Sequence, residues 1–299
     1  MQIDPNYLQS VVTSLNNTTA SEEQLTNELS SGLSVTSLES NPSAVGQSTL
    51  YSSAISRDDS YVQAATTSTA LAQVTDSALG EVVTQLTQAI SLGIEGANDT
   101  SNADNRSTIA GQISSIQDQV LSLANTSYLG QYVFAGSQGT TKPYTQDTTT
   151  TPATTTYNGD SAIQYTTTPT GQKIQTNLAG SSVFGASGAN VFTALNTLAA
   201  DLSGGASSAT LQADTAAVST ALQTVTTQRN VIDNSLTQLQ STSTYTQTSQ
   251  TQLEALQSSL VSANTPSVVT QLSGLETQGQ ALMSVISTLE KNSLFDYLR

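Results

Sequence analysis

The feature that most constrains this chain is a seven-residue apolar repeat in its C-terminal third. The repeat is Leu211, Val218, Val225, Ile232, Leu239, Thr246, Leu253 and Leu260. Leu222 and Leu236 supply intermediate positions. A sustained heptad of this kind is typical of a coiled-coil seam or of one narrow face of a helical bundle. It therefore predicts a long helix over most of 205–260.

A second apolar stripe follows Thr265-Pro266. Its members are Val268, Leu272, Leu275, Gly279, Leu282, Ile286 and Leu289, in steps of four and three. Thr265 is the expected N-cap, with Pro266 at the first helical position. This stripe predicts a separate C-terminal helix.

The N-terminal block, 1–137, also reads as helix. Its first stripe is Leu8, Val11, Leu15, Thr18, Glu22, Leu25 and Leu29, and it ends at the stop signal Ser30-Ser31-Gly32. Thr18 and Glu22 weaken this stripe. Asn41-Pro42 predicts the start of a helix that runs to about Gly93, and Asp104 predicts the cap of another.

The block between the helical flanks, 138–204, is rich in Thr, Gly and Pro. Thr154–Tyr157 and Ser161–Thr167 flank Asn158-Gly159, which predicts a β-hairpin. Pro169-Thr170-Gly171 predicts a turn before a strand with Ile174, Thr176 and Leu178, and a short helix is expected over Asn190–Leu202. For 145–152, the sequence fits a disordered Thr-rich linker and an ordered segment equally well.

Composition removes most catalytic chemistry. The 299 residues include no His and no Cys, so Cys/His zinc sites, Ser–His–Asp triads and Cys nucleophiles cannot form. The net charge of −15 argues against nucleic-acid binding, which needs clustered Lys and Arg. There is neither an 18-residue apolar run nor a basic, apolar leader of the secretory type, so we expect no membrane insertion.

The remaining acidic groups are weak candidates for chemistry. Asp58-Asp59 is expected on a solvated helix face, since consecutive helical residues point about 100° apart. Asp99 and Asp104, with neighbouring Asn residues, lack the spacing of a calcium loop and are expected in an interhelical loop. We therefore expect no enzyme activity, no cofactor and no metal site.

Several motifs, taken in order, carry a family resemblance. They are Leu29-Ser30-Ser31-Gly32-Leu33, Asn41-Pro42-Ser43-Ala44, Gly130-Gln131-Tyr132-Val133-Phe134-Ala135-Gly136 and Ser293-Leu294-Phe295-Asp296-Tyr297-Leu298. Over essentially its whole length the chain resembles the bacterial flagellin family. The Asn-Pro start, the Tyr-Val-Phe segment and the ending are more similar to hook-associated members at the hook–filament junction than to filament flagellin.

The resemblance implies a mainly α fold: a long helical rod or coiled coil formed by both termini, a helical-bundle second domain and a small β-rich inserted domain. The corresponding expected divisions are 1–45 with 260–299, 46–137 with 205–259, and 138–204. The helical flanks and the Thr-rich middle block agree with this organisation on their own.

The resemblance also implies a structural role in the extracellular flagellum, joining hook to filament. Expected partners are a neighbouring hook-associated protein, flagellin, further copies in a ring, and a cytosolic chaperone that assists export without a cleaved signal peptide. A short filament flagellin is the alternative. A secreted Thr-rich adhesin that uses 138–204 is a third hypothesis, from another class.

The expected assembly interface consists of the terminal stripes and the apolar cluster at the chain end. Its residues are Leu8, Val11, Leu15, Leu25, Leu29, Val268, Leu272, Leu275, Leu282, Ile286, Leu289, Leu294, Phe295, Tyr297 and Leu298. Helices this polar are marginal alone, so 1–40 and 265–299 are expected to order fully only between neighbouring subunits.

Overall fold

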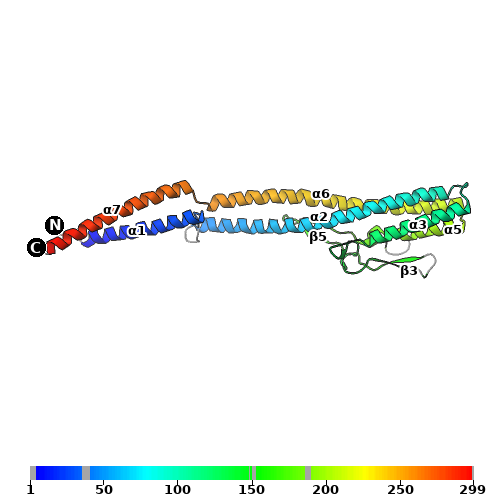
Figure 1. Cartoon of the computed structure of the whole chain (residues 1–299), viewed down its shortest axis with the longest axis horizontal. Coiled ribbons are helices and arrows are strands. Elements are labelled where there is room, and N and C mark those ends of the chain that lie inside the picture. Colours follow the sequence, from blue (N-terminus) through cyan, green and yellow to red (C-terminus); the bar gives the residue numbers. More distant parts are fainter. Residues whose placement is uncertain (1–4, 36–40, 148, 150–152, 186–189, 298–299) are drawn as a thin grey trace. The chain divides into compact units, whose positions relative to one another are not determined.

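The computed structural model describes residues 5–35, 41–147, 149, 153–185 and 190–297, and only the backbone of 5, 6, 8 and 289–297. Its helices are α1 (Pro5–Ser31), α2 (Pro42–Gly96), α3 (Ala103–Ala124), α4 (Gly180–Val183), α5 (Val191–Gly204), α6 (Ser208–Val261) and α7 (Thr265–Tyr297). Figure 1 shows that long helices make up most of the chain, which confirms the mainly α fold.

The chain divides into two compact units. Unit 1 comprises residues 1–56 and 249–299, and unit 2 comprises 57–248. Unit 1 contains α1, α7 and the adjoining ends of α2 and α6. Unit 2 places the Thr-rich block in the same body as the neighbouring helices. The finer three-part division expected from the sequence stays a prediction.

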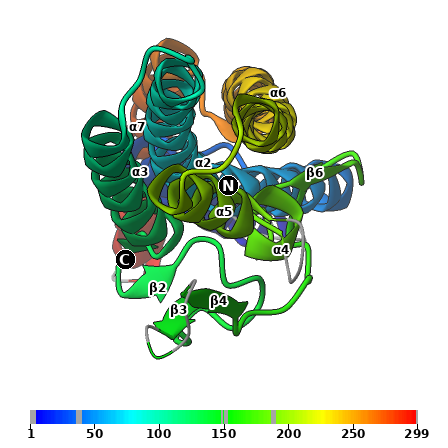
Figure 2. The ribbon, with the colours of Figure 1, turned by 90° about the vertical axis from the view of Figure 1, so that its right-hand side faces the viewer.

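The seven-residue repeat of α6 forms the spine of unit 2. Leu211, Val218, Val225, Ile232 and Leu239 are each 0% exposed. Leu79, Val82 and Leu86 of α2 and Ile113 of α3 are buried in the same core as the first four of them. The helices of this core are grouped in Figure 2, where α3 and α5 lie side by side. The heptad prediction is thus confirmed, because its positions are the ones that α6 turns inward.

Among the described residues of unit 2, the strands form three two-stranded antiparallel sheets. They pair β1 (Ser127–Tyr128) with β2 (Gln131–Tyr132), β3 (Tyr144–Asp147) with β4 (Thr154–Tyr157), and β5 (Tyr165–Thr167) with β6 (Lys173–Gln175). The predicted hairpin across Asn158-Gly159 is therefore wrong. Tyr144 is the partner of Tyr157 instead. The interval 145–152 begins as strand β3, and residues 148 and 150–152 of it lie outside the described residues.

A hydrogen-bonded loop explains why Asn158-Gly159 does not close that hairpin. The Tyr157 hydroxyl donates to the Asp160 carbonyl oxygen at 2.7 Å, and the Asp160 N–H donates to the Ala135 carbonyl oxygen at 3.2 Å. Asp160 Oδ1 accepts from the Ser137 N–H at 2.8 Å. These bonds hold 157–160 against 135–137, so the chain cannot fold back on β4. The expected turn at Gly171 is present, with φ +91°.

Helix starts follow Asn caps, in two cases earlier than expected. Asn41 Oδ1 accepts from the Ala44 N–H at 3.0 Å, which confirms the start of α2. For α3 the cap is Asn102, which accepts from the Asn105 N–H at 2.8 Å, so Asp104 lies in the first turn instead. Asn264 accepts from the Ser267 N–H at 3.3 Å, so it replaces Thr265 as the cap of α7. An Asn amide oxygen preceding the helix makes these bonds readily.

Candidate assembly interface

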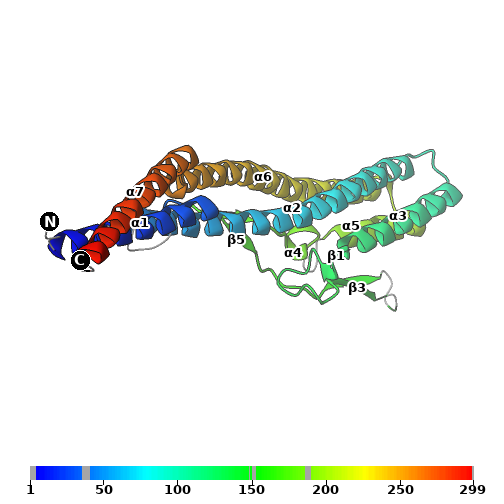
Figure 3. The same cartoon turned by 60° about the vertical axis from the view of Figure 1, so that its left-hand side comes forward.

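Helices α1 and α7 of unit 1 lie side by side and run in opposite directions (Figures 1 and 3). A short antiparallel bridge between Leu33 and Ser262 joins the chain just after α1 to the chain just before α7. The two terminal stripes predicted from the sequence therefore face one another within one chain.

The flagellin-like Leu29–Leu33 motif builds this junction. Gly32 has φ +70°, a left-handed backbone conformation that favours glycine, and its N–H closes the helix on the Glu28 carbonyl oxygen at 2.9 Å. The Gly32 carbonyl oxygen then accepts from the Ala263 N–H at 2.9 Å, and the Ser34 N–H donates to the Val261 carbonyl oxygen at 2.8 Å. The motif thus ends α1 and ties it to the α6–α7 connection.

The α1–α7 pair buries very little. Among the described side chains of unit 1, only Val11, Thr18, Ala44 and Val268 are buried. Other predicted interface residues are half-buried: Leu15, Leu25, Leu272, Leu275, Leu282 and Ile286. Leu29 is 36% exposed. The side chains of Leu8, Leu289, Leu294, Phe295 and Tyr297, and all of Leu298, lie outside the described residues.

The three weak positions of the two stripes meet one another. A Cβ on Gly279 would lie 3.3 Å from Glu22 Oε1 and 3.8 Å from Thr18 Cγ2. Thr18 is buried, and its hydroxyl donates to the Ser14 carbonyl oxygen at 2.9 Å within α1. The missing side chain of α7 therefore makes room for the polar side chains of α1, and the seam stays continuous.

Apolar side chains point outward from this pair. Val12, Val269, Met283 and Val285 are 40%, 46%, 59% and 37% exposed. The sequence reading missed them, although each adjoins a stripe residue: Val12 follows Val11, Val269 follows Val268, Met283 follows Leu282 and Val285 precedes Ile286. Such doublets indicate a helix with two apolar edges, one of which its single partner helix leaves uncovered.

A groove runs between α1 and α7 on one face of unit 1. It measures about 570 Å³ and is lined by Ser21, Gln24, Leu25, Gln271, Gly274, Leu275 and Gln278. Gly274 leaves open space where a Cβ would lie. Two half-buried Leu side chains among uncharged amides and hydroxyls suit a packed helix better than a charged ligand.

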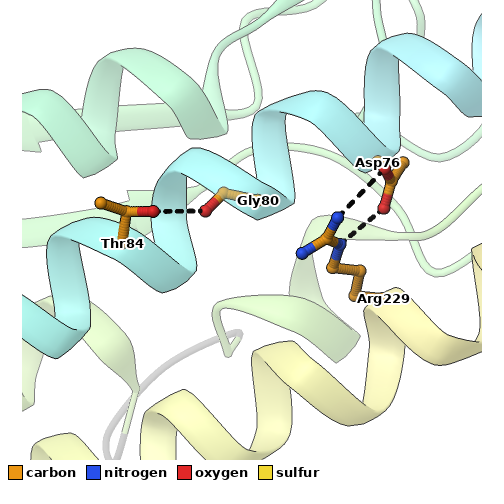
Figure 4. A network of polar contacts seen from close by, with 4 residues as sticks. All are labelled: Asp76, Gly80, Thr84 and Arg229. Carbon is orange, nitrogen blue, oxygen red and sulfur yellow. Dashed lines mark hydrogen bonds and ion pairs between the residues drawn. The ribbon is translucent and has the colours of Figure 1, made fainter.

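Unit 2 contains an ion pair between the long helices α2 and α6. Arg229 of α6 donates from Nε to Asp76 Oδ1 of α2 at 2.6 Å and from Nη2 to Oδ2 at 3.2 Å (Figure 4). This bond holds the pKa of Asp76 below its usual value, whereas burial and the nearby Asp76 raise the pKa of Asp233. The cluster joins two helices of the core.

A second acidic pair lies where α5 meets α6. Burial first, and the neighbouring Asp201 second, raise the pKa of Asp214 to about 6.

Asp58, expected on a solvated face, is instead only 5% exposed because its position on α2 turns inward, while Asp59 is exposed. In the part of the chain that the structure describes, no three acidic side chains gather as metal ligands. The described helices include none that is long and apolar enough to cross a membrane.

Known proteins resemble this chain in sequence. Residues 5–139 match the family model for the bacterial flagellin N-terminal helical region. The resemblance to the bacterial flagellin family is confirmed. The flagellin-like chain is 31% identical over 121 residues to flagellar hook-associated protein 3 of Escherichia coli K12. The match covers 40% of this chain and 38% of that protein, so the chain spans about two fifths of this relative.

Solved structures share the fold of the flagellin-like chain. A Vibrio parahaemolyticus protein described as flagellar hook-associated gives a TM-score of 0.67 at 17% identity, covering 75% of this chain and all of that one. The flagellar junction protein FlgL of Legionella pneumophila gives 0.59 at 14% identity, covering 74% of this chain and all of that one. These structures therefore share the fold over about three quarters of this chain.

Proposed function

We propose that this protein is a non-enzymatic structural subunit of the bacterial flagellum, an adaptor that joins hook to filament. The observation that carries the proposal is the sparse burial in unit 1, where two long paired helices bury few side chains and expose apolar ones. An exposed apolar surface of this kind marks a protein–protein interface. Neighbouring subunits would cover it.

The partners follow from the proposed place in the flagellum. The adaptor would contact a neighbouring hook-associated protein on one side and flagellin on the other, as one ring of identical copies. It would reach the extracellular flagellum through the flagellar export apparatus without a cleaved signal peptide, assisted by a cytosolic chaperone. The relative named hook-associated protein 3 and the fold shared with the junction protein support an adaptor over a short filament flagellin.

Deletion and complementation test the proposal. A strain that lacks this chain should make hooks without filaments and release flagellin into the medium, and the wild-type chain should restore filaments. Met283→Glu should fail to restore them, because a charge on an exposed apolar position would be buried at a neighbour. The matched control Ser284→Glu, at the next and also exposed position, should restore them.

Two outcomes would contradict the adaptor. Filaments composed largely of this chain would establish a filament flagellin. Normal filaments in the deletion strain would remove the flagellar role and favour the Thr-rich adhesin. Complementation by both Glu variants would place the assembly surface elsewhere than at Met283.

A further inference from the structure

The tip of the β1–β2 hairpin carries a strained and exposed leucine. Leu129 has φ +50° and is the one described residue other than glycine with positive φ. It is followed by Gly130 at φ +79°, so both central residues of the turn are left-handed. Gly or Asn fits such a turn without the steric cost that a Leu side chain carries.

The Leu129 side chain is barely covered by its own fold. It is 83% exposed, the most exposed of the large apolar side chains that the structure describes. Strain and exposure together make this an apolar knob that costs stability in the free chain. Residues held in rarely populated conformations concentrate at sites of interaction, where the cost is offset by a partner.

A complementary hole lies elsewhere on unit 2. A cleft of about 450 Å³ opens among α4, α5 and α6, with a mainly apolar lining that includes Val183, Val191, Ala194, Ala217 and Ala221. Its volume accommodates a Leu side chain. In Figure 2, β2 lies below α3 on the left of the unit, whereas α4 and α6 lie on the right. The knob and the cleft therefore belong to different sides of one body.

Charge favours a second copy of this chain as the common partner. Each copy carries −15, so two copies repel except where their surfaces are neutral. No charged residue occurs from 119 to 141, around the knob. The lining segments 174–185, 190–200 and 215–228 also carry none, and among the described residues that line the cleft only Asp214 has a carboxyl group.

From this pairing we infer that Leu129 of one copy inserts into the α4–α5–α6 cleft of the next. A contact between two different patches is heterologous, and repetition of such a contact closes a ring when the rotation permits. The inference rests on the proposed ring, and it adds the side-to-side contact within that ring. The occupant is a second copy, and the recognised group is one aliphatic side chain.

Cysteine pairing tests the contact directly, because the natural chain contains no Cys. The double variant Leu129→Cys, Ala221→Cys should give a ladder of disulfide-linked oligomers on oxidation, in isolated flagella and in the concentrated purified chain. The matched control, Leu129→Cys with Gln223→Cys, uses an exposed α6 residue outside the cleft lining and should give none. A ladder in the control of equal strength would overturn the contact.

Complementation separates this inference from the proposed function. Restored filaments with no ladder, in flagella or in the purified chain, overturn the contact and leave the adaptor role standing. A ladder in the purified chain supports the contact, whereas failure of the wild-type chain to restore filaments in the deletion strain contradicts the adaptor role. The absence of a ladder from both preparations overturns the contact in every case.

A second variant guards against a structural explanation. Leu129→Asn relieves the turn, so the melting temperature of the free chain should stay equal or rise. Self-association should weaken by roughly tenfold to a hundredfold, the effect of losing one buried Leu side chain. Unchanged self-association would overturn the role of Leu129.

Discussion

Arg229 on α6 donates two hydrogen bonds to the carboxylate of Asp76 on α2, and this is the ion pair found among the described residues. Asp233 stands one helical turn beyond Arg229, so a single cation serves two carboxyl groups. In a chain with so few basic residues, this guanidinium is hard to replace. It joins the two long helices at mid-length of unit 2.

Arg229→Met should therefore destabilise unit 2 at pH 7 by about 1 kcal/mol, a modest value because the pair is partly exposed. The lowered pKa of Asp76 gives stability that is present above its usual value near 3.8 and lost as pH falls below it. The difference between wild type and variant should thus shrink below about pH 4. Thermal unfolding measures it, and the exposed Arg57→Met is the control. An unchanged midpoint at pH 7 would refute the stabilising role.

Asp214→Asn should stabilise the protein at neutral pH by about 1 kcal/mol. The pKa of Asp214 is raised to about 6, so its protonated form favours the folded state. That contribution is complete below the usual value near 3.8 and is lost as pH rises through about 6. The variant should lose this pH dependence in urea unfolding between pH 4 and 7. Asp118→Asn, at an exposed position on α3, should keep it.

Two glycine substitutions in unit 1 should have opposite effects. Gly32→Ala should destabilise by about 1 kcal/mol, because φ is +70° there and alanine is strained in that conformation. Gly46→Ala lies within α2 with open space around its Cβ, so it should stabilise by up to about 1 kcal/mol. Circular dichroism on heating compares the two. A stabilising Gly32→Ala would show that the α1 junction does not need the left-handed turn.

Limited proteolysis should trim the free chain at both ends. Helices that bury so little are marginal in water, and so we expect rapid loss of about 1–40 and 265–299, leaving a core of about 45–260. The same ends should resist protease in assembled flagella. Resistant ends in a chain that sedimentation shows to be monomeric would contradict coupling of their order to assembly.

The apolar periodicity of the sequence correctly predicted the long helices and which of their faces turn inward. The heptad of α6 and the terminal stripes were readable because a helix returns to the same face at a fixed interval, and burial selects apolar residues there. The Leu-Ser-Ser-Gly stop and the Asn41 cap were readable because their chemistry is local. These signals give the helices and the candidate interface stripes.

Pairing between distant segments was not readable. Tyr157 pairs with Tyr144, thirteen positions earlier, and the hydrogen bonds of Asp160 that exclude the local hairpin involve residues more than twenty positions earlier. The inward direction of Asp58 and the outward direction of Met283 depend on where the neighbouring helix lies. The apolar stripe of one helix does not show which other segment packs against it.

The pairing of α1 with α7 fixes an order of events during synthesis. Residues of α7 leave the ribosome more than two hundred positions after those of α1. At roughly 5–20 residues per second, α1 waits on the order of 10–50 s for its partner. Unit 2, whose segments all lie between them, can fold first. The first helix to be made is thus among the last to find its place.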